Sequence, residues 1–292
     1  MQNCEFEWIN NLLSKAGSLA ENIGDDACFF GGYLISADMS VEGTHFRLDW
    51  SSPAAAVEKC LLSNFSDINA MGGKSCAILF SVCMNKTWSK KIRNEIADAV
   101  VKVCKKHKVK ILGGDTTGGN TGVFSVMVFG KAGKKILLRS AAASGDDIWL
   151  AGSPGCSGKG FELLKKRKKN LNAEERKFVN LHKVPSPPLA LGKELAKIKG
   201  IGACIDTSDS LAESLLHISQ QSKVRLEIEK SASIFLHSAE DYCLLFTAKK
   251  SAEKKILQLS KKNSIIKIGV AKNGTGIFTD GKKIEVKGWR HF

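Results

Sequence analysis

Aspartates recur in this sequence directly after apolar segments or beside glycine, where side chains at the ends of secondary structure can converge. They are Asp25-Asp26, Asp38, Asp115, Asp206 and Asp209, with Asp67 on an otherwise apolar helix face. Carboxylates brought together without a counter-ion raise one another's pKa, so a converging set needs a cation. Magnesium is the natural candidate, because it prefers oxygen ligands and usually bridges carboxylates to phosphate oxygens. The pattern therefore indicates a magnesium site that takes a phosphorylated ligand.

Each aspartate also has a simpler interpretation, and the sequence leaves both open. Ser208 or Asp209 can cap the helix that follows, and Ser210-x-x-Glu213 is a capping-box pattern. Gly-Asp pairs are common in turns. Convergence in space is therefore an expectation that depends on the whole set of aspartates.

Glycine-rich segments accompany the aspartates at Gly113-Gly114, Gly118-Gly119 and 152–160. Backbone amides in such loops can approach phosphate closely. The last segment is not a P-loop, because that motif has four residues between its glycines and Ser or Thr after its lysine. Here five residues separate Gly152 from Gly158, and a glycine follows Lys159. We therefore interpret 152–160 as a strand-to-helix turn.

Alternating strands and helices must position these residues. The first half reads as strands and helices packed in two layers. A small polar segment at 139–147 marks the expected boundary with a second half that repeats the alternation. The expected strands are 34–39, 76–84, 123–130, 148–151, 203–205, 224–228, 243–247 and 266–270. The expected helices are 53–72, 88–107, 160–169, 189–197 and 210–220.

Composition and charge exclude several classes of protein. The 292 residues carry 44 Lys and Arg against 29 Asp and Glu, a net charge of +15, and 43% are hydrophobic, as in a globular protein of about two domains. No apolar run approaches the ~20 residues of a membrane span, and the acidic first residues do not resemble a signal peptide. The basic run 165–169 has no interleaved aromatic residues, which favours a solvated helix face over nucleic-acid binding. We expect a soluble, cytoplasmic protein with reduced cysteines and neither a nucleic-acid nor a membrane partner.

Nine short motifs follow one another in a fixed order and together carry a family resemblance. Any one of them is weak, but the ordered set is specific. The chain resembles the thiamine-monophosphate kinase family, of the aminoimidazole-ribonucleotide-synthetase-like superfamily, from near its N-terminus to its last residue. The motifs are Gly24-Asp-Asp-Ala27, Val41-Glu-Gly-Thr-His-Phe46, 64–72, Gly113-Gly-Asp-Thr-Thr117, Arg139-Ser140, 145–148, Asp206-Thr-Ser-Asp209, 240–247 and 288–292.

The resemblance implies a layered α/β fold with two α/β domains, 1–140 and 141–292, and an N-terminal sheet that pairs with its twin in a homodimer. It implies ATP-dependent phosphorylation of thiamine monophosphate to thiamine diphosphate, with several Mg²⁺ ions and with ATP as co-substrate. By similarity, the metal-binding residues are Asp26, Ser36, Asp38, Asp67, Asp115, Asp206 and Asp209. The implied nucleotide-binding residues are His107, Gly114, Asp115, Arg139 and Ser208, and the implied substrate-binding residues are His45, Glu240 and Trp289.

The chemistry of phosphoryl transfer agrees with these roles, because it depends on positioning and charge neutralisation more than on covalent steps. The acceptor phosphate is already largely ionised near neutral pH, with a second pKa of roughly 6. A general base is therefore dispensable, and we expect direct in-line transfer without a covalent nucleophile. Trp289 and Tyr242 offer aromatic surface to a cationic thiazolium ring.

The sequence departs from the family pattern at several positions. Ala37 replaces a hydroxyl residue, Ser210 replaces a glycine, and Ser238-Ala239 replaces a pair of glycines. His107 stands where the family often has a tyrosine near the adenine, and the segment 230–238 is shortened. None of these departures removes a metal-binding aspartate. The alternatives are another superfamily member, or a non-catalytic one that binds ATP.

Overall fold

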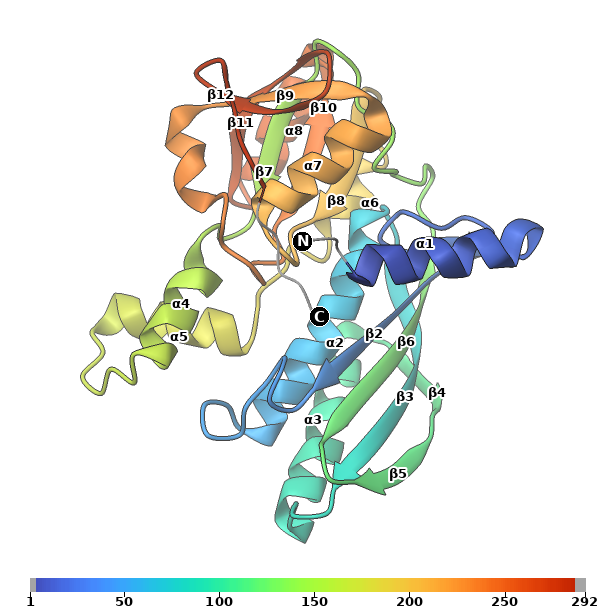
Figure 1. Cartoon of the computed structure of the whole chain (residues 1–292), viewed down its shortest axis with the longest axis vertical. Coiled ribbons are helices and arrows are strands. Elements are labelled where there is room, and N and C mark those ends of the chain that lie inside the picture. Colours follow the sequence, from blue (N-terminus) through green and yellow to red (C-terminus); the bar gives the residue numbers. More distant parts are fainter. Residues whose placement is uncertain (1–3, 287–292) are drawn as a thin grey trace.

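The computed structural model describes residues 4–286, which form two β-sheets with helices packed on them (Figure 1). The strands of the first sheet lie between residues 28 and 131, and those of the second lie between 147 and 283. This arrangement confirms the expected layered α/β fold. In this part of the chain no helix is both long and apolar enough to span a membrane. The cysteines from Cys28 to Cys243 are free thiols, as predicted.

The first sheet has six strands within the described residues, in the order β1-β2-β6-β3-β4, with β5 also paired to β3. β2, β6 and β3 are antiparallel neighbours, whereas β4 and β5 run parallel to β3. The strand expected at 34–39 extends to Val41, so Asp38 lies inside β2 rather than at its end. The strands are β1 (Cys28–Phe30), β2 (Tyr33–Val41), β3 (Lys74–Asn85), β4 (Lys110–Gly113), β5 (Thr116–Gly119) and β6 (Val123–Lys131).

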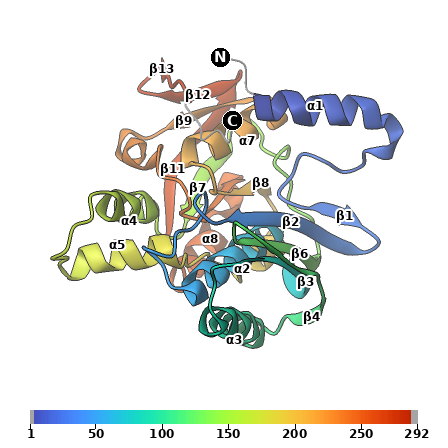
Figure 2. The ribbon, with the colours of Figure 1, turned by 60° about the horizontal axis from the view of Figure 1, so that its bottom comes forward.

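Two long helices, α2 (Pro53–Ala70) and α3 (Lys90–His107), cover one face of this sheet (Figure 2). Each begins at a serine whose side chain accepts a hydrogen bond from a backbone N–H of the first turn, Ser52 for α2 and Ser89 for α3. Such caps stabilise a helix start, and proline at the first position of α2 is already held in helical φ. Phe65 and Val100 from these helices pack with Phe124 of β6 in the first hydrophobic core.

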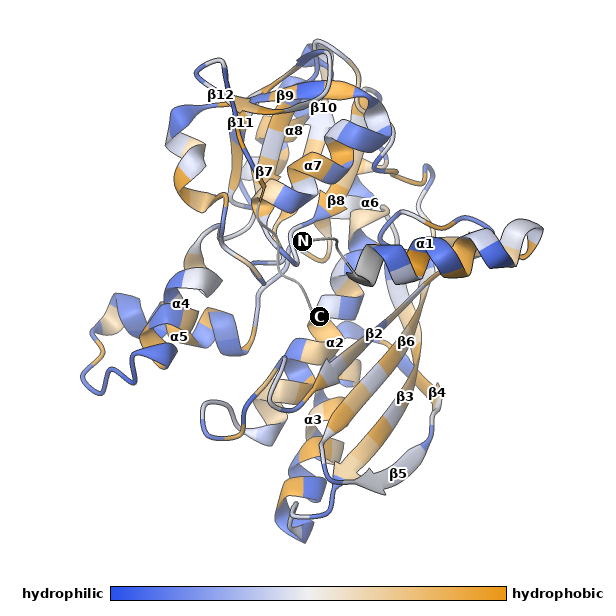
Figure 3. Ribbon diagram, in the orientation of Figure 1, coloured by the Kyte–Doolittle hydropathy of each residue, from blue (hydrophilic) through white to orange (hydrophobic). Residues whose placement is uncertain are grey.

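The opposite face of the first sheet is apolar and open to solvent. Tyr33, Met39 and Met127 are 43%, 57% and 39% exposed. The register pairs Ala37 with Met127 and Met39 with Ser125, so these side chains share one face. Figure 3 shows β2, β6 and β3 as largely hydrophobic. An apolar face of this kind marks an interaction surface.

The second sheet has seven strands within the described residues, in the order β13-β12-β9-β11-β7-β10-β8. Helices cover both of its faces: Ile148 and Leu150 of β7 pack in a core with α7, whereas Trp149 and Ala151 pack in a core with α6 and α8. Burial on both faces explains why β7 reads as an unbroken apolar run. The strands are β7 (Asp147–Ala151), β8 (Ile201–Asp206), β9 (Val224–Ile228), β10 (Leu244–Ala248), β11 (Ile265–Asn273), β12 (Gly276–Thr279) and β13 (Lys282–Lys283).

Both strands and helices differ from expectation. The short strands β1, β4, β5, β12 and β13 were not predicted. The helix expected at 160–169 is α4 (Cys156–Lys165), which begins earlier because Asp241 accepts hydrogen bonds from the N–H groups of Gly155 (2.7 Å) and Ser157 (2.8 Å). The strand-to-helix turn is therefore confined to 152–155, and residues 156–160, also interpreted as turn, already belong to α4. The helices α1, α5 and α8 were not predicted, and the helix expected at 189–197 is only the short α6. The helices not yet bounded are α1 (Cys4–Ala16), α5 (Ala173–Lys183), α6 (Leu191–Leu195), α7 (Leu211–Ser222) and α8 (Glu253–Ser260), with 3₁₀ turns at Gly17–Leu19, Lys230–Phe235 and Lys250–Ala252.

Candidate active site

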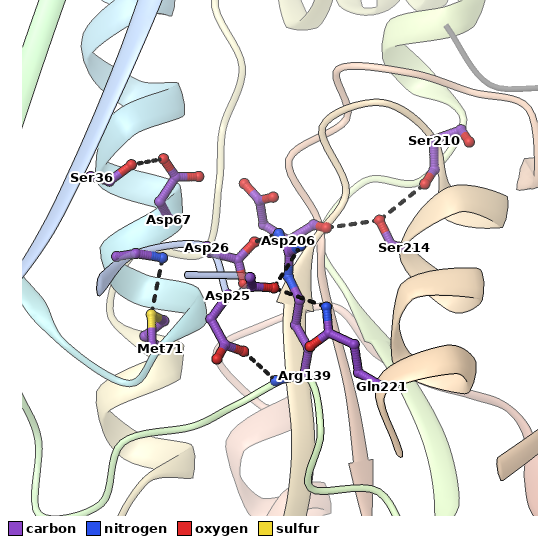
Figure 4. A network of polar contacts seen from close by, with 12 residues as sticks. Asp25, Asp26, Ser36, Asp67, Met71, Arg139, Asp206, Ser210, Ser214 and Gln221 are labelled. Atoms are coloured by element: carbon purple, nitrogen blue, oxygen red, sulfur yellow. Dashed lines mark hydrogen bonds and ion pairs between the residues drawn. The ribbon is translucent and has the colours of Figure 1, made fainter. Parts of the chain in front are cut away.

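Three of the aspartates expected to bind metal meet between α2 and β8 (Figure 4). Asp26 lies in the loop before β1, Asp67 lies on α2, and Asp206 is the last residue of β8. Each offers one carboxylate oxygen, and these three oxygens lie within 4.8 Å of one another. The convergence that the sequence left open is thus present for these three residues, which we call the aspartate cluster.

Burial and mutual repulsion dominate the electrostatics of the aspartate cluster. Desolvation is the largest cause that raises the pKa of Asp26, Asp67 and Asp206 above the ordinary value of a carboxyl group, and neighbouring aspartates raise it further. Desolvation likewise raises the pKa of Asp38 to about 6, with contributions from the charges of Asp209 and Asp26. A bound cation reverses this effect because it favours the ionised carboxylates.

The aspartate cluster has fewer protein donors than its oxygens need. Arg139 Nη2 donates to Asp26 Oδ1 at 2.8 Å, and Ser36 Oγ donates to Asp67 Oδ2 at 2.5 Å. The Oδ2 atoms of Asp26 and Asp206 are buried and have no hydrogen-bond partner within the described residues. Buried polar atoms normally have partners, since an unsatisfied one is costly. An all-oxygen set with unpartnered carboxylate oxygens fits a hard divalent cation such as Mg²⁺.

Arg139 ties the loop that carries Asp26 to the connection between the sheets. Its backbone N–H donates to Asp25 Oδ1 at 2.7 Å, and its Nη1 donates to the Gly24 carbonyl at 3.3 Å. Gln221 of α7 donates to the same carbonyl at 2.9 Å. The Arg139 guanidinium, expected to contact the nucleotide, therefore lies next to the aspartate cluster.

Gly114 and Asp115, also expected at the nucleotide, lie at the turn between β4 and β5. Gly114 has a φ of 151°, and a Cβ at this position would come within 1.8 Å of the Phe80 carbonyl oxygen, so only glycine fits. Asp115 is exposed, and its N–H donates to Ser81 Oγ at 3.1 Å. β3 and β6 separate this turn from β2, and Asp115 is not part of the aspartate cluster.

His107 occupies the last position of α3 and packs against α2. Its ring lies 5.6 Å from the Phe65 ring, centroid to centroid, in an edge-on arrangement. Burial lowers the pKa of His107, and the positive charge of Lys106 lowers it further. The ring does not line the cavity described next, so the structure does not bring it together with the other expected site residues.

A cavity of about 1220 Å³ opens beside the aspartate cluster. Its walls come from β2, the loop that follows β2, α2, α4, α5 and the segment 234–242. His45 Nδ1 accepts a hydrogen bond from the Val41 N–H at 3.1 Å, so a neutral His45 ring carries its proton on Nε2. Trp289 lies outside the described residues. The expected site residues that line the cavity are Asp38, His45, Asp67, Ser208, Asp209 and Glu240.

The cavity is also lined by side chains that were not predicted from the sequence. One is Lys59 of α2. Its position could have been predicted, because Lys59, Ser63 and Asp67 are spaced four residues apart and so share one face of α2. Phe161 of α4 and His182 of α5 are two more, with ring centroids 5.5 Å apart. No periodic signal marks these two, because they meet only when α4 and α5 pack together.

Comparison with known proteins shows which proteins this chain is similar to. Residues 24–132 match the family described as AIR synthase related protein, N-terminal domain. The thiamine-monophosphate kinase of Buchnera aphidicola subsp. Schizaphis graminum is 32% identical over 328 aligned residues, which span all of both chains. That of Aquifex aeolicus is 28% identical over 89% of this chain and 88% of its own length.

Solved structures agree with the sequence relatives. The structure of AaThiL complexed with AMPPCP and TMP superposes with a TM-score of 0.89 at 27% identity, over 100% of this chain and 99% of that one. A hydrogenase maturation protein HypE in complex with ATP has a TM-score of 0.70 at 16% identity, over 95% of each chain, and shares the fold alone. The fold and the aspartate cluster thus define an AIR synthase-related α/β enzyme. Within that class, the chain belongs to the thiamine-monophosphate kinase family.

Proposed function

We propose that this protein transfers the γ-phosphoryl group of ATP to the phosphate of thiamine monophosphate, giving thiamine diphosphate and ADP. The observation that carries the proposal is the aspartate cluster beside a cavity large enough for a substrate, in a chain that aligns over its full length with a thiamine-monophosphate kinase. The structure of AaThiL complexed with AMPPCP and TMP supports both substrates. The protein is thus a kinase, a transferase that binds ATP.

The residues divide into three roles in this proposal. Asp26, Asp67 and Asp206 would hold Mg²⁺, aided by Ser36, Asp38 and Asp209, and the bound metal would neutralise phosphate charge. Asp115, at the separate turn between β4 and β5, would be a ligand of a further Mg²⁺ ion. Arg139, Gly114, Asp115, Ser208 and His107 contact the nucleotide, although the position of His107 against Phe65 makes it the weakest member of that set. His45, Glu240 and Trp289 hold thiamine monophosphate.

Side chains of the protein also contribute to the transfer, by their positions and charges. The Arg139 guanidinium lies beside the aspartate cluster, where it offsets part of its negative charge. His45 lines the cavity, and its ring is held in place by the Val41 N–H on Nδ1. The acceptor phosphate supplies its own ionised oxygen, so transfer proceeds in line without a covalent nucleophile.

Three further features belong to the proposal. The chain divides into domains 1–140 and 141–292, which is supported by strands of the first sheet that all precede residue 132 and strands of the second that all follow residue 146. Two copies pair through the apolar face of the first sheet around Met39 and Met127. The protein works in the cytoplasm, which free cysteines support.

The test is incubation of the purified protein with Mg-ATP and thiamine monophosphate, followed by chromatographic separation of thiamine diphosphate. We expect product only when metal is present and only from the monophosphate, with none from free thiamine. ATP binding without any product would instead support the alternative of a non-catalytic superfamily member. Product from free thiamine would assign a different acceptor.

A further inference from the structure

Lys59 of α2 is a buried lysine that lines the cavity. It is only 7% exposed, and its Nζ lies 2.6 Å from Oε1 of Glu240, which is a direct ion pair. Breaking a buried pair by removing one partner is costly, because the other charge stays behind uncompensated. The pair therefore fixes the position of the Glu240 carboxylate.

His182 of α5 approaches the same carboxylate from the other side. Its Nδ1 lies 3.6 Å from Glu240 Oε2 and 3.0 Å from Ser157 Oγ of α4. Burial lowers the pKa of His182 to about 4, and the charge of Lys59 contributes, so the ring is neutral at neutral pH. The contact with Glu240 is consequently not an ion pair, and Lys59 is the charged partner of the carboxylate.

The backbone beneath Glu240 is equally constrained. Glu240 has a φ of 57°, in the left-handed region, and its N–H donates to the Ser208 carbonyl at 2.6 Å. The next residue, Asp241, is held by the first amides of α4 at Gly155 and Ser157. A non-glycine residue persists in this conformation only when its surroundings determine it. The Glu240 side chain remains 28% exposed, at the cavity wall.

The position of this carboxylate along the cavity suggests what it recognises. Lys59, Ser63 and Asp67 of α2 all line the cavity, and eight residues of helix separate Lys59 from Asp67, about 12 Å along the axis. On α2, Lys59, which contacts Glu240, therefore lies about two helical turns from Asp67 of the aspartate cluster. An ionised carboxylate accepts hydrogen bonds and donates none.

We propose that Lys59 and His182 are positioning residues that hold Glu240 as a fixed acceptor, and that this acceptor selects substrates carrying an amino group at the end remote from the phosphate. The inference rests on the proposed function, in which that group is the exocyclic amine of the aminopyrimidine ring. In an analogue with a carbonyl in place of the amine, the carbonyl oxygen would face the Glu240 carboxylate. Both are hydrogen-bond acceptors, so neither would find a donor in the other. Sites built around such a hydrogen bond discriminate strongly against analogues that lack the donor.

The experiment measures kcat and KM for thiamine monophosphate and for its oxo analogue, oxythiamine monophosphate, together with KM for ATP. We expect the unaltered protein to prefer the amine. Lys59→Met should lower that preference about tenfold or more by raising KM for thiamine monophosphate, while KM for ATP changes less than about twofold. Lys59→Arg, which keeps the charge, should restore most of the preference.

Two further variants separate recognition from general effects. Lys166→Met removes the same charge from the same cavity wall without a recorded contact to Glu240, and it should leave the preference within about twofold of the unaltered protein. Glu240→Gln can donate from its amide and should shift preference towards the oxo analogue, which decides the matter if Lys59→Met does not fold. His182→Gln should lower the preference by less than Lys59→Met, because His182 supplies no charge.

Several outcomes overturn the inference while leaving the proposed function intact. One is an unchanged preference in both Lys59→Met and Glu240→Gln. Another is a Lys59→Met protein that loses kcat and raises KM for ATP as much as KM for thiamine monophosphate, which indicates a structural role only. Failure of the proposed function itself is distinct, because the unaltered protein would then form no thiamine diphosphate at all.

Discussion

At the scale of single residues, keeping carboxylate charges buried in the aspartate cluster lowers the free energy of unfolding of the metal-free protein. Asp206 illustrates this, since burial and Asp26 raise its pKa and its Oδ2 has no partner within the described residues. We predict that Asp206→Asn lowers turnover roughly 10²–10³-fold, by analogy with the loss of one preorganised charge-stabilising group. Thermal unfolding of the metal-free variant at neutral pH should nevertheless occur at a higher temperature, because a buried charge has gone.

A matched control for this prediction is Asp280→Asn, because Asp280 is exposed in a turn before β13 and has a positive φ that asparagine tolerates. It should leave both turnover and unfolding temperature unchanged. If Asp206→Asn instead destabilised the metal-free protein, the cluster would be a hydrogen-bonded structural feature rather than a site awaiting a cation.

At the scale of elements, α7 shows how a departure from the family pattern is accommodated. Ser210, expected from the resemblance to stand in place of a glycine, accepts a hydrogen bond on its Oγ from the Glu213 N–H at 3.1 Å as the helix N-cap. The φ of Ser210 is −175°, an extended conformation that needs no glycine. The capping interpretation is thus correct for Ser210, and Ser208 and Asp209 remain at the cavity.

This cap leads to a prediction about stability. Ser210→Ala should lower the free energy of unfolding by about 1 kcal/mol, whereas Ser210→Gly, which restores the family residue, should cost only a few tenths of a kcal/mol. Denaturant unfolding monitored by circular dichroism measures both. Equal losses in the two variants would mean that the Ser210 side chain does not cap α7.

At the scale of the whole molecule, protonation and metal binding compete for the same carboxylates. The pKa of Asp38 is about 6, above the ordinary value of 3.8, and those of Asp26, Asp67 and Asp206 are also raised. A carboxyl group whose pKa is raised by folding contributes to the free energy of unfolding at a pH below its ordinary pKa. This contribution is lost as the pH rises through the raised pKa of the folded protein. The rise in unfolding temperature that Mg²⁺ causes should therefore be larger at about pH 7.5 than at about pH 5.

Buried histidines change the stability of the protein with pH in the opposite direction to these aspartates. The measurement is therefore the difference in unfolding temperature with and without Mg²⁺, and not the unfolding temperature itself. Burial lowers the pKa of His182 and of His217 to about 4, so their contribution to stability is lost as pH falls. That contribution is present with and without metal and cancels in the difference. A Mg²⁺ effect that does not depend on pH would contradict metal binding at the aspartate cluster.

The apolar face of the first sheet makes a second prediction at this scale. Met127→Lys places a charge in the middle of that face, and it should convert the proposed dimer into monomers, measured by light scattering coupled to size-exclusion chromatography. Leu257→Lys is the control, because Leu257 is an exposed apolar residue on α8, outside the first sheet. A protein that is monomeric before substitution would remove the dimer from the proposal.

The sequence predicted the long, periodic elements well. Pro53 and the serine cap before it define the start of α2, and the apolar segments of β2, β3 and β6 define the first sheet. It was less successful where signals were short or distant. The capping box of Asn172 and Glu175 was a local signal for α5 that was overlooked. The start of α4 had no local signal, because Asp241, more than eighty residues away, supplies its N-terminal acceptor.

What the sequence determined by itself was the set of acidic residues, their order and the family they belong to, because each motif is a local pattern of side chains and turns. Only the tertiary structure decided which of these residues meet. Asp26, Asp67 and Asp206 converge while Asp115 does not, and Lys59 finds Glu240 across the cavity. The physical reason is that these contacts join α2, β8 and separate loops, whose relative positions depend on the packing of the hydrophobic cores rather than on local sequence.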